Sequence, residues 1–377
     1  MGNDTSIQGT PANVTPPKFD GSTLVKRLTG LLAKDNVSDI HLSSDEPIRM
    51  RVDGALKPLD EKLIVVDELR AFAHILAGYS IEDHKDFSKR GDKDFPANLG
   101  AWRLRCNYFK KGAGGRGLAI RRLEQTVPNF DDLNLPESLL LMADKAKGLL
   151  LVTGPTGSGK STTLSAVIDY INATRYGHII TMEDPIEYKF VSKKCLIDQR
   201  QIGNDASDFH AALRSALRQD PDVIVVGEMR DKETAQMALD AAETGHLVLA
   251  TLHTVSARQT IERVTGLFSG SEREWAQQTL ASVLNGVMSQ VLVERKEGGR
   301  VLCYELMVNT SAVKQAIRDN RIPTISNIME TGTKDNQILM NKNLIALVRN
   351  GDVSLEDALY YSYDSISLQN ELKDVTY

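Results

Sequence analysis

Several residue types and patterns are scarce in this sequence, and each scarcity excludes a class of protein. Only three cysteines, Cys106, Cys195 and Cys303, occur in 377 residues, and none is spaced as a CxxC pair. A disulfide framework and a four-cysteine zinc site are therefore excluded. No apolar run reaches the roughly 18 residues of a membrane-spanning helix, and the N-terminus lacks the apolar core of a signal peptide.

An excess of positive charge is also missing. The 45 basic and 50 acidic residues leave a formal net charge of −5 and an isoelectric point near 5.9. A protein that follows a nucleic-acid backbone usually carries a basic surface, so we expect no nucleic-acid partner. The hydrophobic share of 41% is ordinary for a soluble globular protein. The length suits two or three domains.

Changes in composition along the chain predict an order of domains. Proline-rich residues 1–18 are expected to be a disordered lead-in, and Pro128 and Pro136 indicate a linker. Between these segments, alternating strand patterns and two helical stripes predict a small α+β domain. After the linker, strands and helices alternate, which is typical of a mostly parallel sheet covered by helices. The predicted parts are 1–18, 19–123, 124–136, a larger α/β domain at 137–310 and a helical region at 311–377.

The expected elements follow from hydrophobic periodicity. In the first domain they are a helix near 24–32, strands 39–42 and 48–52, a hairpin turn at Asp53-Gly54 after the second strand, a helix at 67–77, and strands 102–108 and 117–121. In the second they are strands 148–153, 178–182, 223–226 and 247–251, with helices 162–173, 207–218 and 232–244 and another from about Ser256. From Trp275 onward a mainly helical chain is expected, broken by a hairpin of 291–293 and 301–306.

One segment carries a specific chemical signal. Its residues read G-x-x-x-x-G-K-S, between an apolar strand and a helix, as in the phosphate-binding loop of nucleotide hydrolases. Glycines turn backbone N–H groups inward, and the helix dipole favours an anion. Lys160 is expected to reach the β- and γ-phosphates of ATP, and the Ser161 hydroxyl to ligate Mg²⁺. The predicted nucleotide-binding residues are Gly154, Pro155, Thr156, Gly157, Ser158, Gly159, Lys160, Ser161 and Thr162.

Acidic residues end two of the predicted strands. Glu228 follows the apolar strand 223–226, as the acid of a Walker B element does, and is expected near Mg²⁺. Glu183, Asp184 and Glu187 cluster after strand 178–182. Each feature has a simpler interpretation, a surface glutamate or a solvated acidic turn, but the upstream phosphate loop favours a role in catalysis. Spacing alone does not decide which acid activates water.

Histidines and arginines complete the set of candidates. His246 and His253 bracket strand 247–251, and His253 lies at the carboxyl end, where it could sense the γ-phosphate. His246 taken alone is more easily structural. The predicted strands of the first domain carry several arginines. These side chains could equally be solvated charges on edge strands or arginine fingers that reach a phosphate from another domain or subunit. These arginines are Arg103, Arg105, Arg116, Arg121 and Arg122.

Taken together and in this order, the segments resemble the secretion and type IV pilus motor ATPases, and within them the pilus retraction branch, the PilT/PilU family. The resemblance covers about residues 20–365. It is carried by Ser38-Asp39-Ile40-His41-Leu42, Arg51-Val52-Asp53-Gly54, Gly154–Thr163, Thr181–Tyr188, Ala212–Asp222, Gly227–Asp231, Ala242–His246, Thr251–Thr254 and Ala316-Ile317-Arg318.

The resemblance implies a PAS-like N-terminal domain, a RecA-like ATPase domain and a homohexameric ring. It implies that Lys160 and Ser161 hold phosphate and Mg²⁺, that Glu228 is the Walker B acid, and that Glu187 activates water. His246 and His253 would belong to a histidine box. Arg105, Arg116 and Arg121 match basic positions expected near the nucleotide. Glu183 and Glu187 belong to an acidic box of the family. Glu183, Arg116 and His246 are further predicted nucleotide-binding residues.

The implied function is ATP-driven pilus retraction and twitching motility. The ring would lie at the cytoplasmic face of the inner membrane, held there only through partners: a pilus platform protein and a paralogous retraction ATPase. The absent zinc motif favours retraction, whereas Asn336–Met340 depart from the family pattern. Three alternatives remain open: a pilus assembly or secretion motor, an ATP-binding scaffold, and a nucleic-acid motor of similar fold. A GTPase is disfavoured because Asn341-Lys342-Asn343-Leu344 falls short of the NKxD motif.

Overall fold

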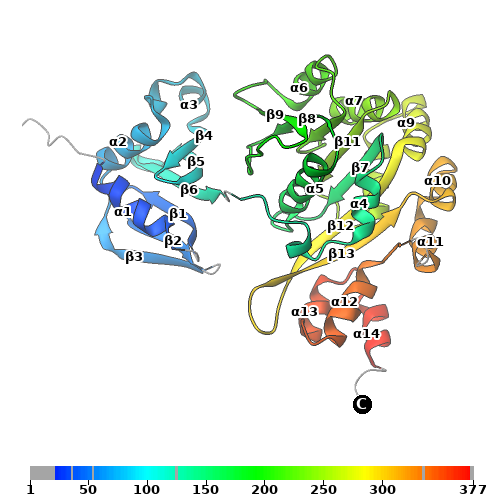
Figure 1. Ribbon diagram of the computed structural model, residues 1–377. Coiled ribbons are helices and arrows are strands. Elements are labelled where there is room, and N and C mark those ends of the chain that lie inside the picture. Colours follow the sequence, from blue (N-terminus) through cyan, green and yellow to red (C-terminus); the bar gives the residue numbers. More distant parts are fainter. Residues whose placement is uncertain (1–21, 35–36, 53–54, 124–125, 333–335, 374–377) are drawn as a thin grey trace, which may run out of the picture. The chain divides into compact units, whose positions relative to one another are not determined.

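The computed structural model describes residues 22–34, 37–52, 55–123, 126–332 and 336–373 (Figure 1). The chain divides into two compact units between Gln125 and Thr126. We call these the N-terminal unit and the C-terminal unit and describe each by itself. The expected lead-in at 1–18 and the expected turn at Asp53-Gly54 lie outside the described residues.

The N-terminal unit is built on a six-stranded sheet in the order β3-β2-β1-β6-β5-β4. Every neighbouring pair of its strands runs antiparallel. Its elements are α1 (Ser22–Leu32), β1 (Val37–Ser43), β2 (Pro47–Val52), β3 (Ala55–Leu63), α2 (Val66–Ala77), a 3₁₀ turn (Ile81–Asp83), α3 (Lys85–Arg90), β4 (Asp92–Leu99), β5 (Trp102–Lys110), a short turn (Gly112–Gly114) and β6 (Arg116–Leu123).

Only one face of this sheet is apolar. On β5 the buried residues Leu104, Cys106 and Tyr108 alternate with more exposed polar ones, as expected for a half-buried strand. They share one core with the faces of α1 and α2. Two strands were not predicted from the sequence: β3, whose side chains are almost all exposed, and β4, which contains Pro96. Both are edge strands, where such sequences are tolerated.

The C-terminal unit holds a seven-stranded sheet in the order β13-β12-β7-β11-β10-β8-β9, parallel except for β13. Its strands are β7 (Gly148–Thr153), β8 (Gly177–Glu183), β9 (Cys195–Gln201), β10 (Val223–Val226), β11 (Leu247–Leu252), β12 (Leu284–Glu294) and β13 (Arg300–Val308). Its helices are α4 (Glu137–Ala143), α5 (Lys160–Thr174), α6 (Phe209–Ala216), α7 (Lys232–Glu243), α8 (Ala257–Gly266), α9 (Ser271–Val283), α10 (Ser311–Arg318), α11 (Ile325–Thr331), α12 (Met340–Arg349), α13 (Leu355–Tyr361) and α14 (Ser365–Lys373), with 3₁₀ turns at Asp131–Leu133 and Ile322–Thr324.

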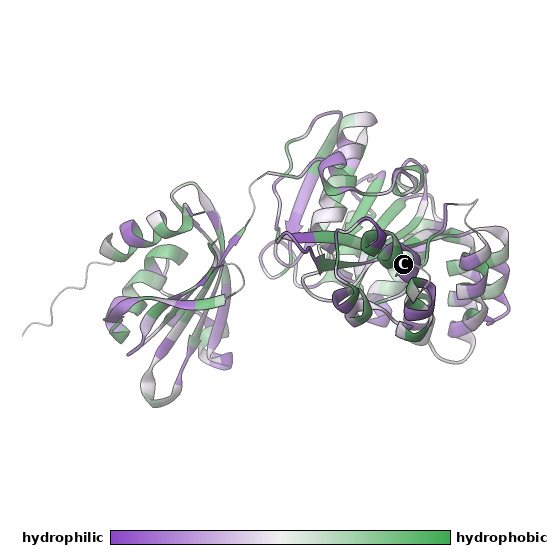
Figure 2. Cartoon of the chain, turned by 90° about the horizontal axis from the view of Figure 1, so that it is seen from below, coloured by the Kyte–Doolittle hydropathy of each residue, from purple (hydrophilic) through white to green (hydrophobic). Residues whose placement is uncertain are grey.

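Both faces of this second sheet are covered. Every residue of β7, β10 and β11 is buried, and Figure 2 shows these central strands as hydrophobic. One core packs the sheet against α4 and α5, and another packs it against α6–α10. Burial on both faces explains why the strands read as continuous apolar runs rather than alternating ones.

Two segments differ from the expectations. Residues 284–290, expected in a helical stretch, form the first part of β12. This run is buried at every position, and such a run has no periodicity that separates strand from helix. The segment 126–136, within the expected linker, packs on the C-terminal unit through Phe130 and Leu135. Within the described residues, none of the helices has the length and apolarity needed to cross a bilayer.

Candidate nucleotide site

The phosphate loop joins the buried strand β7 to the N-terminus of α5. Three of its glycines have positive φ: Gly154 (147°), Gly157 (81°) and Gly159 (86°), the last at the N-cap position of α5. A Cβ on Gly154 would lie 2.2 Å from the carbonyl oxygen of Gln290 on β12, so only glycine fits there. The loop therefore has the backbone geometry that aims N–H groups at an anion.

Side chains inside the loop are arranged to receive a charged group. The Lys160 ammonium donates to the carbonyl oxygens of Gly154 (2.8 Å) and Pro155 (2.9 Å) and is thus folded over the loop. The Ser158 hydroxyl is buried and has no partner among the described residues. From β12, the Gln290 amide donates to the Ser158 carbonyl (2.7 Å) and holds the loop in place. Pro155 and Thr156 are exposed at its tip.

A chain of polar contacts runs from Lys160 to the end of β10. His253 Nε2 lies 3.0 Å from Glu228 Oε1, and His253 Nδ1 lies 3.5 Å from the Lys160 ammonium. Arg230 also forms an ion pair with Glu228. Burial raises the pKa of Glu228, but the hydrogen bond from Arg230 and the nearby His253 outweigh it, and the pKa is lowered. The structure thus gathers Lys160, His253 and an ionised Glu228 at the carboxyl edge of the sheet.

Glu187 belongs to the same electrostatic environment. Burial lowers the pKa of Lys160, and the negative charges of Glu228 and Glu187 act against that shift. Glu187 lies in the loop after β8, and this loop is tied to α5 by a 3.2 Å contact between the hydroxyls of Tyr188 and Thr162. Two carboxylates are therefore held near the phosphate loop, one after β8 and one after β10.

Glu183, predicted to bind nucleotide, is hydrogen-bonded to neighbouring side chains of β8 and β9. Its Oε1 accepts from the Thr181 hydroxyl (2.6 Å) and the Gln199 amide (3.1 Å). Burial raises its pKa despite these hydrogen bonds. Gln199, on β9, also donates to the Tyr188 carbonyl (2.8 Å) and accepts from the Phe190 N–H (3.0 Å). Sequence reasoning missed both Gln199 and β9, because this edge strand is mostly polar.

His246 is separated from this cluster. It precedes β11, whereas His253 follows that strand, so the two histidines lie at opposite ends of a six-residue strand. Its Nδ1 lies 2.9 Å from the carbonyl oxygen of Ala241, at the end of α7. Within the C-terminal unit the structure brings His253 to the phosphate loop, and it does not bring His246 there.

Oxygen donors suited to Mg²⁺ stand beside the loop. The Ser161 hydroxyl lies in the first turn of α5, and Glu228 follows β10, which is separated from β7 by β11. The described residues contain no group of three or more metal-binding side chains. Mg²⁺ usually takes one or two protein ligands together with substrate phosphates and water. The glycine-lined loop with its unpartnered Ser158 hydroxyl is consistent with such a substrate.

The N-terminal unit carries a second group of candidates, arranged in one row across four strands. The cross-strand register places Arg51, Asp39, Arg121 and Arg105 side by side on β2, β1, β6 and β5. Asp39 accepts from Arg121 (2.8 Å) and lies 3.8 Å from Arg51. Burial raises the pKa of Asp39, but hydrogen bonds from Arg121 and Ser38 outweigh it and lower the pKa. The Arg121 side chain remains 62% exposed.

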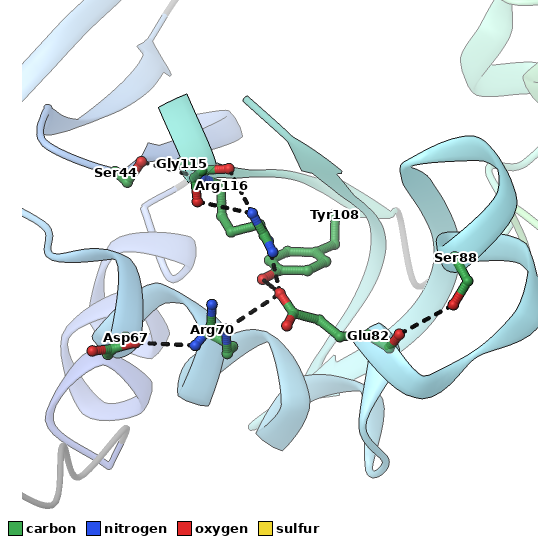
Figure 3. A network of polar contacts seen from close by, with 9 residues as sticks. Ser44, Asp67, Arg70, Glu82, Ser88, Tyr108, Gly115 and Arg116 are labelled. Atoms are coloured by element: carbon green, nitrogen blue, oxygen red, sulfur yellow. Dashed lines mark hydrogen bonds and ion pairs between the residues drawn. The ribbon is translucent and has the colours of Figure 1, made fainter. Parts of the chain in front are cut away.

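Arg116 has a different environment, shown in Figure 3. Its Nε donates to Glu82 (2.7 Å), and its NH1 donates to the carbonyl oxygens of Gly114 (2.9 Å) and Gly115 (3.0 Å). Glu82 also accepts from the Tyr108 hydroxyl (3.0 Å). With 14% of its side chain exposed, Arg116 is committed to its own unit, unlike Arg121.

Known proteins resemble this chain over most of its length. The family described as Type II/IV secretion system protein matches residues 22–360. The type IV pilus retraction ATPase PilT of Pseudomonas aeruginosa is 41% identical over 335 residues, which cover 89% of this chain and 96% of that protein. A twitching motility protein of Neisseria gonorrhoeae is 42% identical over 292 residues, covering 76% of this chain and 78% of that protein.

The fold has a solved counterpart. A crystal structure of the pilus retraction motor PilT with bound ADP superposes with a TM-score of 0.83 at 41% identity, covering 92% of this chain and 98% of that one. The predicted α/β fold and the resemblance inferred from the sequence are therefore confirmed. The identity of the individual site residues remains a prediction.

Proposed function

The chain belongs to the family of type II/IV secretion system proteins, and from this membership we propose that it is a Mg²⁺-dependent ATPase that powers type IV pilus retraction. The observation that carries the proposal is the contact chain Lys160–His253–Glu228 beside a glycine-lined phosphate loop. Relatives named for pilus retraction and twitching motility match most of the chain, which supports retraction in particular.

The side chains divide the work of hydrolysis as follows. Lys160 and the backbone N–H groups of the loop hold the β- and γ-phosphates and offset their charge. Mg²⁺, when bound, neutralises charge that develops on the phosphate oxygens. Glu187 accepts a proton from the attacking water. Ser161 and Glu228 hold the ion, and His253, in contact with both Lys160 and Glu228, responds to the presence of the γ-phosphate.

The N-terminal unit supplies positive charge in this proposal. Arg105 and Arg121 stand on the face of its sheet that lacks an apolar core, and Arg121 is largely exposed. We assign them to the phosphates of a nucleotide held by a C-terminal unit in a homohexameric ring, where alternating hydrolysis moves the units. The ring acts from the cytoplasmic face of the inner membrane on a platform protein, together with a paralogous retraction ATPase.

The chemistry is tested by two matched pairs of variants. Lys160→Ala and Glu187→Gln are expected to lower phosphate release from MgATP by at least about 100-fold. The exposed Lys194 and Glu233 provide Lys194→Ala and Glu233→Gln as controls, which should retain wild-type turnover. Undiminished turnover in Lys160→Ala or Glu187→Gln would remove that residue from the mechanism. Sedimentation velocity with and without nucleotide tests the ring.

The direction of the motor is tested in cells. A strain that lacks this chain should carry surplus pili that fail to retract and should lose twitching motility. Complementation with Glu187→Gln should leave that phenotype in place, whereas Glu233→Gln should reverse it. A deletion strain with no pili, or with blocked protein export, would instead identify an assembly or secretion motor.

A further inference from the structure

A buried acid lies outside the nucleotide site, at the start of two helices. Glu305 on β13 is 6% exposed. Its Oε1 accepts from the N–H of Ala257 (2.8 Å) and its Oε2 from the N–H of Met340 (3.4 Å), the first residues of α8 and α12. Burial raises the pKa of Glu305, whereas the two N–H donors and the positive ends of two helices favour its charged form. One carboxyl group thus joins two helices that are 83 residues apart in sequence.

Glu305 continues into a row of buried hydroxyls. Strand register places it beside Ser289 on β12, and Ser289 beside Thr153 on β7. The hydroxyls of Ser289 and Thr153 are 2.8 Å apart, and the Thr260 hydroxyl of α8 lies 3.5 Å from that of Thr153. Burying a polar group without a hydrogen-bond partner costs free energy. Because these hydroxyls satisfy one another, the row favours one position of α8 on the sheet.

Both ends of the row reach the nucleotide site. Thr153 immediately precedes Gly154, the first residue of the phosphate loop. On the other side, only three residues separate His253 from the anchored Ala257, and the first of these, Thr254, contacts the Thr260 hydroxyl (2.7 Å). His253 is therefore joined to the start of α8 by a short segment that also contacts Thr260 of that helix.

The same strand carries the C-terminal helices. Leu306, next to Glu305, exchanges two backbone hydrogen bonds with Ile338 (2.8 and 3.0 Å), just before α12. Cys303 shares a buried cluster with Leu344 of α12 and Leu368 of α14. The segment that enters α12 is thus held on β13 at the position where Glu305 contacts Met340.

We propose that Glu305 is a positioning residue for ATP hydrolysis, which holds α8 and the His253 loop in register with the phosphate loop and links that register to the docking of α12–α14. The proposal rests on the proposed ATPase function for its kinetic consequence. Its structural consequence, a coupling between nucleotide binding and the start of α12, is independent of turnover.

Two variants of the full chain test the kinetic consequence. Glu305→Gln keeps the size of the side chain and one acceptor oxygen but turns an NH₂ group toward an N–H donor. Glu305→Met keeps the volume and removes both acceptors. We expect each to lower kcat by about 10- to 100-fold while the Kd for ADP changes less than about threefold, because the phosphate loop is intact. The matched control is Glu297→Gln, at the exposed turn between β12 and β13.

Hydrogen exchange tests the coupling. In the wild-type chain and in Glu297→Gln, a non-hydrolysable ATP analogue with Mg²⁺ should slow exchange at residues 253–260 and also at 340–344. In Glu305→Gln and Glu305→Met the protection at 340–344 should disappear. The proposal is wrong if wild-type protection never reaches 340–344, or if the variants keep wild-type kcat per folded molecule. An inactive wild-type chain that still shows this coupling would overturn the ATPase assignment and leave the structural link standing.

Discussion

The two sheets of this protein solve the problem of burial in opposite ways. In the N-terminal unit an antiparallel sheet covers one face with α1 and α2 and leaves a row of arginines on the other. In the C-terminal unit a largely parallel sheet is covered on both faces, and charged groups gather at the carboxyl ends of its strands. The comparison teaches that the candidate charged residues lie on one face of the sheet in the N-terminal unit and at one edge of the sheet in the C-terminal unit. Only in those places are they outside the apolar core.

The largest effects should come from neighbouring residues on one strand. Leu150 and Leu151 of β7 are both fully buried but belong to the two different cores of the C-terminal unit. Replacing either with Ala should lower the free energy of unfolding by about 2–5 kcal/mol. In the N-terminal unit Leu104→Ala should cost about the same, whereas Arg105→Ala should change stability by less than about 0.5 kcal/mol.

The chain has one tryptophan in each unit, so tryptophan fluorescence can follow the unfolding of each unit separately. Trp102→Phe leaves Trp275 to report urea unfolding of the C-terminal unit, and Trp275→Phe leaves Trp102 to report the N-terminal unit. Equal costs for Leu104→Ala and Arg105→Ala would contradict the one-sided core of the first sheet.

A second, intermediate effect separates the arginines of the N-terminal unit. Arg116→Ala removes the donor to two carbonyl groups and one donor to Glu82, which keeps Tyr108 and Arg70. This variant should lower the stability of that unit by about 1–3 kcal/mol. Arg121→Ala removes one partner of the nearly buried Asp39, which keeps the Ser38 hydroxyl and the nearby Arg51. This variant should therefore cost only about 1 kcal/mol.

ATPase activity should be affected in the reverse order, with a larger loss in Arg121→Ala than in Arg116→Ala. If Arg121 reaches a phosphate, Arg121→Ala lowers phosphate release by at least about tenfold, while Arg116→Ala keeps wild-type turnover per folded molecule. A large kinetic loss in Arg116→Ala at unchanged stability would mean that its contacts with Glu82 open during the cycle.

The smallest effect is a difference in pH dependence. Hydrogen bonds from Arg121 and Ser38 outweigh burial and lower the pKa of Asp39, so its contribution to stability is complete above about pH 4 and is lost as pH falls further. Burial raises the pKa of Glu183, so the folded state binds its proton more readily. Its contribution therefore becomes more favourable as pH falls from 7 toward 5.

Urea midpoints of the two single-tryptophan proteins, compared with Asp39→Asn and Glu183→Gln in the same backgrounds, check these opposite signs. The advantage of the parent over Asp39→Asn should shrink below about pH 4, and its advantage over Glu183→Gln should grow between pH 7 and 5. The same sign at both positions would show that one of the two environments is wrong.

Much of the phosphate site could be predicted because it is local. Residues 154–161 follow one another, so their spacing alone specifies a loop between a strand and a helix. Glu228 and His253 could also be predicted, because each follows a continuous apolar run that is recognisable as a buried strand. The edge strands β3, β4 and β9 could not, because edge strands carry polar residues and prolines that resemble loops.

The sequence by itself determined the phosphate loop and the alternation of strands and helices in the C-terminal unit. Only the tertiary structure decided that Arg116 is held by Glu82, that Gln199 secures the acidic loop, and that Glu305 joins α8 to α12. The reason is physical: these partners are 11 to 48 residues apart in sequence. The sequence pattern around a polar side chain is the same whether its hydrogen-bond partner is water or a backbone group far away in the chain.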